Sequence, residues 1–204
     1  MSCIKEGVLV LYAKIVQSDI SAPLIPDSRD REVRACKSER ARLEKYLVWK
    51  LLERAVREHT TLDFANLQFA KTENGQWICP DFYFSLAHTD GAVCVALSSR
   101  AVGVDIEKIR PIKAEMIPRF LTEREREYML SLSEDQRERF FFECWVAKES
   151  IFKRGAGRAL MPRDIETLDT DRTVIPIRLD GDDYLIAIAT ENNEKCEIRF
   201  MEEI

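Results

Sequence analysis

In the first third of the chain, the pattern of apolar and polar residues is typical first of a β-strand and then of an α-helix. A β-rich apolar run at Val8–Val16 predicts a strand, and residues 27–59 then show a charged, helical pattern. An apolar residue recurs every four positions in this segment, as in an amphipathic helix, at Leu43, Leu47, Leu51 and Ala55. Arg40 lies at the N-terminal edge of that stripe, where it is either a snorkelling end residue or part of a site.

Short strands are predicted in the middle of the chain, at Phe82–Ala87, Ala92–Ser98 and Val102–Glu107. In the second of these, larger and smaller apolar side chains alternate, so both faces are expected to be covered.

The second half begins with helical patterns over Lys113–Leu132 and Glu134–Arg154. A hairpin of Thr173–Leu179 and Tyr184–Ala189 is expected next, and a last strand at Glu194–Met201. Each half thus runs strand, long helix and a group of strands. This order predicts an α+β fold with two similarly built lobes, residues 1–101 and 102–204.

Composition narrows the class of protein. The 204 residues are 46% apolar and 33% charged, as in a globular protein, and a net charge of −5 gives no reason to expect nucleic-acid binding. The six cysteines form no CxxC pair, and no secretion leader or apolar run of membrane-spanning length is seen. We therefore expect free thiols and a cytoplasmic location.

Two carboxylates share one face of the strand predicted near residue 105. Asp105 and Glu107 alternate with the apolar Val104 and Ile106, which places the acidic Cβ atoms about 6–7 Å apart. Gly103 is expected to leave space beside them. Like charges this close repel unless a cation lies between them, although an edge strand with a solvated acidic face is the alternative.

The helix ending near Arg154 carries a third acid and two ammonium groups. Glu149 and Lys153 are one turn apart, Lys148 lies beside them, and Phe140–Phe142 indicates that this helix is largely buried. Buried charge is costly unless it is paired or bound to metal. A Glu149–Lys153 pair is the simpler reading, but three acids with lysines suit a divalent cation that holds a phosphate.

The residues around these groups resemble the motifs of a known family. Residues 103–107 (GVDIE) and 145–153 (WVAKESIFK) match G-x-D-x-E and W-x-x-K-E-[SA]-x-x-K, the signature motifs of the Sfp-type 4′-phosphopantetheinyl transferases. Leu121-Thr122-x-x-Glu125 resembles the acidic motif between them, and residues 84–88 (FSLAH) resemble the upstream Ser-His motif.

This resemblance implies an enzyme that transfers 4′-phosphopantetheine from coenzyme A to a serine of an acyl or peptidyl carrier protein and releases adenosine 3′,5′-bisphosphate. It also implies a monomer with two pseudo-symmetric lobes and an active site between them. Mg²⁺, with Mn²⁺ as an alternative ion, would bind Asp105, Glu107 and Glu149. The rival reading is a non-catalytic module, derived from such an enzyme, that binds coenzyme A or the carrier.

The resemblance, together with the need of the transfer for a base, assigns roles to single residues. Glu149 is the expected general base with Glu125 as runner-up, and Lys153 would stabilise the departing bisphosphate. His88 is expected at the 3′-phosphate, although a histidine that starts a turn more often has a structural role. The coenzyme contacts expected are Arg40, Lys71, Gly75, Gln76, Ser85, His88, Asp105, Lys148 and Lys153.

One part of the expected site departs from the family's motifs, and the expected carrier-docking surface lies outside them. Gly75-Gln76-Trp77 replaces the family's Gly-Lys-Pro, so one lysine contact is missing and Lys71 is its candidate substitute. Carrier docking is expected at Lys113 and Arg119 with their apolar neighbours, which could equally be an ordinary amphipathic helix.

Overall fold

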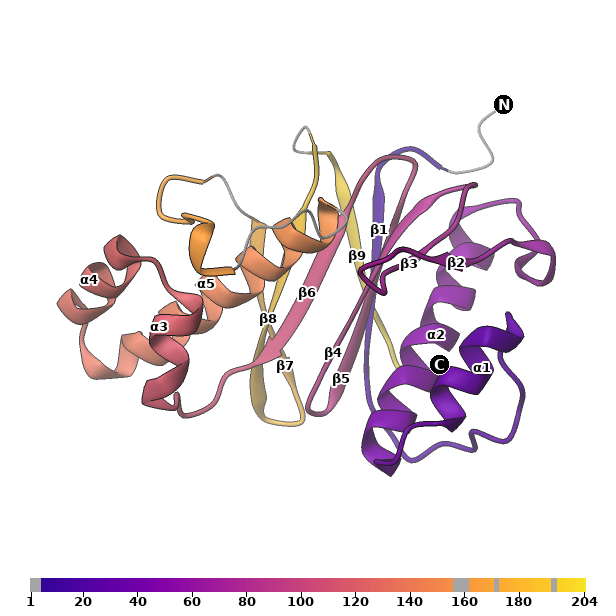
Figure 1. Cartoon of the computed structure of the whole chain (residues 1–204), viewed down its shortest axis with the longest axis horizontal. Coiled ribbons are helices and arrows are strands. Elements are labelled where there is room, and N and C mark those ends of the chain that lie inside the picture. Colours follow the sequence, from indigo (N-terminus) through magenta and orange to yellow (C-terminus); the bar gives the residue numbers. More distant parts are fainter. Residues whose placement is uncertain (1–4, 156–161, 171–172, 192–193) are drawn as a thin grey trace.

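The computed structural model describes residues 5–155, 162–170, 173–191 and 194–204. Two β-sheets lie between two long helices, α2 (Glu39–His59) and α5 (Glu134–Arg154), as Figure 1 shows. The mixed α and β composition that the sequence predicts is confirmed.

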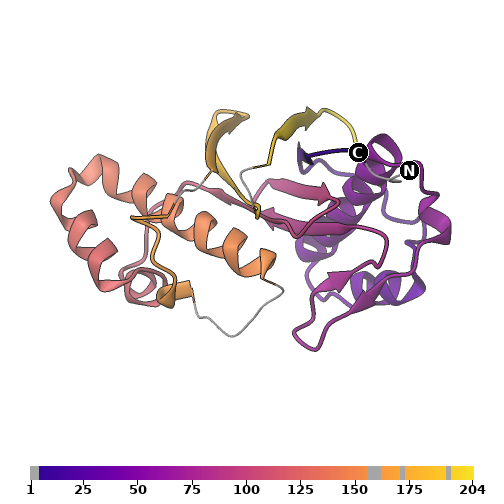
Figure 2. The same cartoon turned by 90° about the horizontal axis from the view of Figure 1, so that it is seen from above.

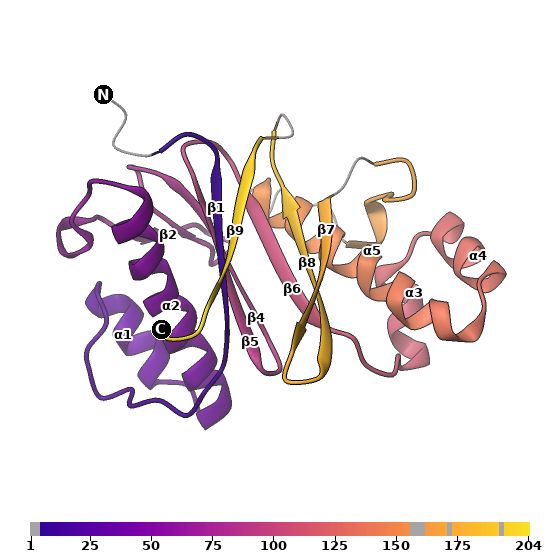
Figure 3. The same cartoon turned by 180° about the vertical axis from the view of Figure 1, so that it is seen from behind.

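The first sheet has the strand order β4-β5-β1-β9. Its strands are β1 (Val8–Lys14), β4 (Tyr83–Thr89), β5 (Ala92–Ser98) and β9 (Cys196–Met201). β1 pairs antiparallel with β5 and parallel with β9, so a strand from the end of the chain lies beside the first one (Figure 3). The remaining N-terminal elements are α1 (Asp27–Arg34), η1 (Phe64–Asn66), β2 (Ala70–Lys71) and β3 (Trp77–Ile78).

The second sheet has the order β6-β8-β7 and is antiparallel throughout. Its strands are β6 (Gly103–Lys108), β7 (Thr173–Leu179) and β8 (Asp182–Ala189). α5 runs alongside β6, as the view from above shows (Figure 2). The shorter helices of this half are η2 (Ala114–Met116), α3 (Ile117–Phe120), α4 (Glu123–Ser131) and η3 (Pro162–Asp164).

Strand alternation determines which core each side chain enters. Leu9 and Leu11 pack with the apolar stripe of α2, whereas Val8 and Val10 enter a second core between the two sheets. Val104 and Ile106 also enter that second core. The opposite face of β6, which carries Asp105, is therefore left to face α5. The sequence-based assignment of the two faces of this strand is confirmed.

Two expected helical regions are interrupted. The pattern over residues 27–59 forms α1 and α2, which are separated before Ser38; the Ser38 side chain accepts the Ala41 backbone N–H and caps α2. Likewise, the region 113–132 is divided before α4, where Thr122 and Glu125 form a capping box. These local hydrogen bonds compete with a continuous helix and set the boundaries.

None of the helices in the described part of the chain combines the length and the apolar character that crossing a bilayer requires. The five described cysteines are free thiols, of which Cys79, Cys94 and Cys144 are buried. Cys3 lies outside the described residues.

Candidate active site

β6 and α5 approach each other closely at Gly103. A Cβ atom on Gly103 would lie 1.9 Å from the Ser150 carbonyl oxygen and 2.6 Å from the Arg154 backbone nitrogen. Only glycine is compatible with this contact. The expectation that Gly103 leaves open space beside the carboxylates is wrong, because the helix backbone fills that space and thereby brings Asp105 next to α5.

Asp105 and Lys153 form an ion pair across this contact. Lys153 Nζ lies 2.7 Å from Asp105 Oδ1, and the aspartate side chain is 8% exposed. Burial raises the pKa of Asp105, while the ammonium of Lys153 opposes that shift. Lys153 therefore interacts with the strand carboxylate; the simple Glu149–Lys153 helix pair is not among the ion pairs of the described residues.

Glu107 and Glu149 both sense the charge of Asp105. Burial, followed by repulsion from Asp105, raises the pKa of Glu107 to about 7 and also raises the pKa of Glu149. Glu107 accepts a hydrogen bond from Thr89 Oγ1 at 3.0 Å. The three acids thus share one electrostatic environment, and a cation among them would relieve the repulsion.

The described residues do not, however, form a ready metal site. No three histidine, cysteine, aspartate or glutamate side chains among them are grouped to hold an ion, so the expected convergence of Asp105, Glu107 and Glu149 is not seen. The donors still suit Mg²⁺. Asp105 Oδ2 is buried and has no hydrogen-bond partner among the described residues, and carboxylate oxygens are the ligands that this ion prefers.

A second group of charges lies at the far end of β4. His88 Nδ1 is 3.1 Å from Glu44 Oε2, and Arg40 Nε is 2.8 Å from Glu44 Oε1. These side chains, together with Asp90, Glu107 and Arg110, line an open cavity of about 360 Å³. His88 and Arg40 are therefore brought together, as the expected coenzyme site requires, and they lie on the same cavity as Glu107.

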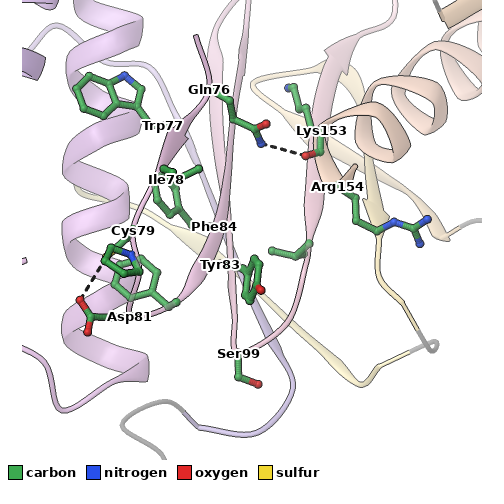
Figure 4. Close-up of a pocket in the computed structure, with 13 residues that line it drawn as sticks. Gln76, Trp77, Ile78, Cys79, Asp81, Tyr83, Phe84, Ser99, Lys153 and Arg154 are labelled. Carbon is green, nitrogen blue, oxygen red and sulfur yellow. Dashed lines mark hydrogen bonds between the residues drawn. The ribbon is translucent and has the colours of Figure 1, made fainter. Parts of the chain in front are cut away.

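Gln76 joins the N-terminal half to the end of α5. Its side-chain nitrogen donates a hydrogen bond to the Lys153 carbonyl oxygen at 3.0 Å, beside a cavity of about 390 Å³ that Trp77, Tyr83 and Arg154 also line (Figure 4). A neighbouring cavity of about 280 Å³ contains Gly75 and shares Gln76, Trp77 and Lys153. The segment that replaces Gly-Lys-Pro therefore does reach the site.

Comparison with known proteins agrees with this geometry. A family model described as "4'-phosphopantetheinyl transferase superfamily" matches residues 101–198, which include β6 and α5. The second half of the chain is therefore similar to this superfamily. Among its relatives are three transferases from bacilli. 4'-Phosphopantetheinyl transferase Sfp of Bacillus subtilis (strain 168) is 29% identical over 117 residues, 56% of this chain and 52% of the relative. The transferase ffp of Bacillus subtilis is 28% identical over 155 residues (74% and 65%), and psf-1 of Bacillus pumilus is 31% identical over 106 residues (50% and 46%). The chain thus spans about half to two thirds of the length of these relatives.

Two residues expected at the site are fully buried. Glu125 and Lys148 have 0% exposed side chains and form an ion pair. Glu125 Oε1 accepts hydrogen bonds from the backbone and hydroxyl of Thr167, and Lys148 Nζ also donates to the Phe120 carbonyl oxygen at 2.7 Å. Although burial raises the pKa of Glu125, these hydrogen bonds and the Lys148 charge lower it overall. The structure gives both side chains a buried partner, while a role of Glu125 as a base and of Lys148 as a coenzyme contact stays a prediction.

Ser85 has a structural role as well. Its hydroxyl is buried and accepts the Val104 backbone N–H at 3.0 Å, which ties β4 to β6 at the junction of the two sheets. A contact of Ser85 with the coenzyme stays a prediction. Lys71, by contrast, lies 2.7 Å from Glu32 and 39% exposed, and it remains available to an anion.

Sequence reasoning missed Glu44 and Glu32. Glu44 lies one helical turn after Arg40 and within the buried stripe of α2, and a carboxylate in an apolar stripe is the signal that could have identified it. Glu32 Oε2 accepts from Lys71 Nζ and from Trp77 Nε1 at 3.1 Å. It carries no comparable signal, because α1 is charged throughout.

Proposed function

We propose that this protein transfers 4′-phosphopantetheine from coenzyme A to a serine of an acyl or peptidyl carrier protein and releases adenosine 3′,5′-bisphosphate. The observation that carries the proposal is the meeting of the two signature segments, where Lys153 of α5 contacts Asp105 of β6 beside Glu149. The match to the superfamily model and the relatives named as transferases support the same reaction.

In the proposed reaction the serine oxygen forms a bond to the phosphorus of the phosphopantetheine group. The bond from that phosphorus to the bridging oxygen of the bisphosphate breaks, and the serine proton passes to a base. Glu149 is the proposed base: it is half-buried, and its raised pKa makes it a better proton acceptor near neutral pH than an ordinary glutamate. Lys153 would stabilise the negative charge on the leaving oxygen.

We assign Asp105, Glu107 and Glu149 as the residues that would hold Mg²⁺, with Mn²⁺ as an alternative ion. Bound there, the ion would neutralise pyrophosphate charge. Lys153 presently interacts with Asp105, and the pyrophosphate offers this ammonium a second partner. Arg40 and His88 are proposed to bind the 3′-phosphate, with Lys71, Gly75 and Gln76 along the remaining coenzyme.

The finer architecture belongs to the same proposal. We treat residues 1–101 and 102–204 as two pseudo-symmetric lobes, each a sheet covered by one long helix, in a monomeric cytoplasmic enzyme. The packing of α2 on β4 and β5, and of α5 on β6 and β8, supports this division. β9 is the exception, since it crosses from the second half into the first sheet. Lys113 and Arg119, which are exposed, form the proposed carrier-docking surface.

The decisive experiment is incubation with coenzyme A, Mg²⁺ and a panel of apo carrier proteins, followed by intact-mass measurement. A mass gain of one phosphopantetheinyl group on a carrier, abolished by replacing its acceptor serine with alanine, is the expected result. No gain on any carrier, while a known transferase modifies the same panel, would contradict the proposal.

One observation favours a second candidate, a module that binds coenzyme A or the carrier without catalysis. Asp105 is already neutralised by Lys153, and the described residues hold no ready group of metal ligands. Calorimetry with coenzyme A separates the two functions: binding strengthened by Mg²⁺ supports the enzyme, whereas metal-independent binding without turnover supports the module.

A further inference from the structure

Glu44 is a charged residue in an apolar setting. It lies on α2 between the helix cap and the buried residues Leu47 and Val48, and its side chain is 9% exposed. A buried carboxylate lowers stability unless its charge and hydrogen-bonding capacity are satisfied. The partners that satisfy this one are two residues of the candidate coenzyme site.

Each oxygen of Glu44 contacts one of those residues. Oε1 lies 2.8 Å from Arg40 Nε and Oε2 lies 3.1 Å from His88 Nδ1. The second nitrogen of the guanidinium is also fixed, since Arg40 Nη2 lies 3.1 Å from Asp90 Oδ1. Because Nδ1 of the imidazole is held by the carboxylate, Nε2 is the ring nitrogen that can meet a ligand in the cavity.

We propose that Glu44 is a positioning residue that holds His88 and Arg40 for the 3′-phosphate, and thereby makes the protein select coenzyme A over 3′-dephospho-coenzyme A. The inference rests on the proposed function, because that function places the 3′-phosphate at these two side chains. The inference adds Glu44 as the residue that orients His88 and Arg40, and it names the 3′-phosphate as the group of the ligand that depends on this orientation.

Electrostatics supports this geometry. Partial desolvation lowers the pKa of His88, and Glu44 opposes the lowering, while the cations Lys153, Lys45 and Arg29 add to it. The imidazole therefore lies in the field of several cations, which favours a phosphate ligand, and Glu44 Oε2 lies 3.1 Å from its Nδ1. A carboxylate placed behind a ligand-binding histidine fixes the ring and its tautomer, as it does around metal sites.

A purely structural role for Glu44 makes a different prediction. If the carboxylate only attached α2 to β4, its removal would lower thermal stability and weaken all coenzyme derivatives alike. The positioning role affects only the ligand that carries the 3′-phosphate. The ratio of two affinities is therefore the informative quantity.

The experiment is calorimetric titration of coenzyme A and 3′-dephospho-coenzyme A into the wild type, Glu44→Gln and a control, Glu143→Gln. The control removes a similar helix pair, in which Arg139 Nε lies 2.9 Å from Glu143 Oε1 on α5. We expect Glu44→Gln to lose about tenfold of the preference for coenzyme A, the size of one or two charge-assisted hydrogen bonds, and to bind the dephospho form as the wild type does. The control is expected to keep the wild-type ratio.

Three outcomes would overturn the inference. If Glu44→Gln keeps the wild-type ratio, Glu44 does not position the site although the proposed function stands. If the wild type shows no preference between the two ligands, the 3′-phosphate does not bind at His88 and Arg40. If Glu44→Gln does not fold, nitrogen NMR of the wild type decides: a His88 ring without its proton on Nδ1 contradicts the proposed orientation.

Discussion

Lys153 Nζ lies 2.7 Å from Asp105 Oδ1, and this ion pair joins the last turn of α5 to the middle of β6. Both partners come from the segments that give the sequence its resemblance to a transferase family. The pair is partly shielded from water, since Lys153 is 25% and Asp105 8% exposed. Their contact shows that the two segments share one site, although they are more than forty residues apart in the chain.

Replacing Lys153 by methionine is expected to weaken coenzyme A binding about tenfold or more, because the pyrophosphate loses a charge-assisted hydrogen bond. Turnover is expected to fall further, since the same ammonium is proposed to stabilise the leaving group. Calorimetry and the carrier assay measure the two effects. Lys50→Met, at a partly exposed helix pair with Glu53, is the control. Normal affinity and turnover in Lys153→Met would remove this residue from the site.

Glu149→Gln is expected to reduce turnover about 10²–10⁴-fold, the usual contribution of a positioned base, and to reduce the strengthening of coenzyme binding by Mg²⁺. The test is the single-turnover rate at saturating Mg²⁺. Glu143→Gln, at the Arg139 pair on the same helix, is the control. A near-normal rate would show that another group accepts the serine proton.

Lys148→Met is expected to lower the free energy of unfolding by about 3–5 kcal/mol, because it leaves the Glu125 carboxylate unpaired in the interior. Urea titration measures the loss. Arg139→Met, at a largely exposed pair, is expected to cost less than about 1 kcal/mol. The double variant Lys148→Met with Glu125→Gln, which removes the uncompensated charge, is expected to be more stable than Lys148→Met alone. A loss no larger than that of Arg139→Met would contradict the importance of the pair.

Gly103→Ala is expected to lower the free energy of unfolding by more than the about 1–3 kcal/mol that an added methylene usually costs in a packed core. The reason is that the new Cβ atom would clash with the backbone of α5, which cannot shift without moving the whole helix. Gly155→Ala is the matched control, since the nearest atom to its Cβ would be 3.6 Å away. Thermal and urea unfolding compare the two. Equal stability would mean that β6 and α5 separate easily at this point.

The free energy of unfolding is expected to depend on pH through Glu32. Burial raises the pKa of Glu32, but the hydrogen bond from Lys71 and the charges of Arg29 and Lys71 outweigh it and lower the pKa to about 2 from an ordinary 4.5. Since the folded-state pKa lies below the unfolded value, the contribution is complete above about pH 5 and is lost as the pH falls toward 2.

Glu32→Gln is therefore expected to be about 1–3 kcal/mol less stable than the wild type at pH 7, and the difference is expected to shrink between pH 5 and pH 2. Urea titrations at several pH values measure it, with the exposed Glu202→Gln as control. A difference that does not change with pH would show that the loss comes from packing and not from charge.

Local patterns predicted most elements of the fold. α5 and β7 begin and end at the expected residues, and the two faces of β6 follow from the alternation of Val104 and Ile106 with the acids. The strand at the end of the chain was also expected, but its partner was not. Period and turn chemistry define a strand, whereas the parallel pairing of β9 with β1 depends on contacts between distant residues.

The sequence motifs predicted which residues belong to the candidate site, but they did not predict which of these residues are buried or what they contact. Lys148 stands in the same motif as Glu149, and Glu125 stands in the motif between the two signature segments. Spacing does not show that Lys148 and Glu125 face each other in a dry interior. In the same way, the sequence does not show that Ser85 ties two sheets together. Burial and partner choice are tertiary properties, and they separate structural from functional residues here.

The parallel pairing of β9 with β1 has a consequence for biosynthesis. The first sheet remains without one edge strand until Cys196–Met201 has left the ribosome. The β1 strand therefore keeps unpaired hydrogen-bonding groups on one side while the 181 residues between Lys14 and Cys196 are made. Contacts this distant in sequence also slow refolding. A nascent chain stalled before residue 196 is a natural target for chaperones that recognise unpaired strand edges.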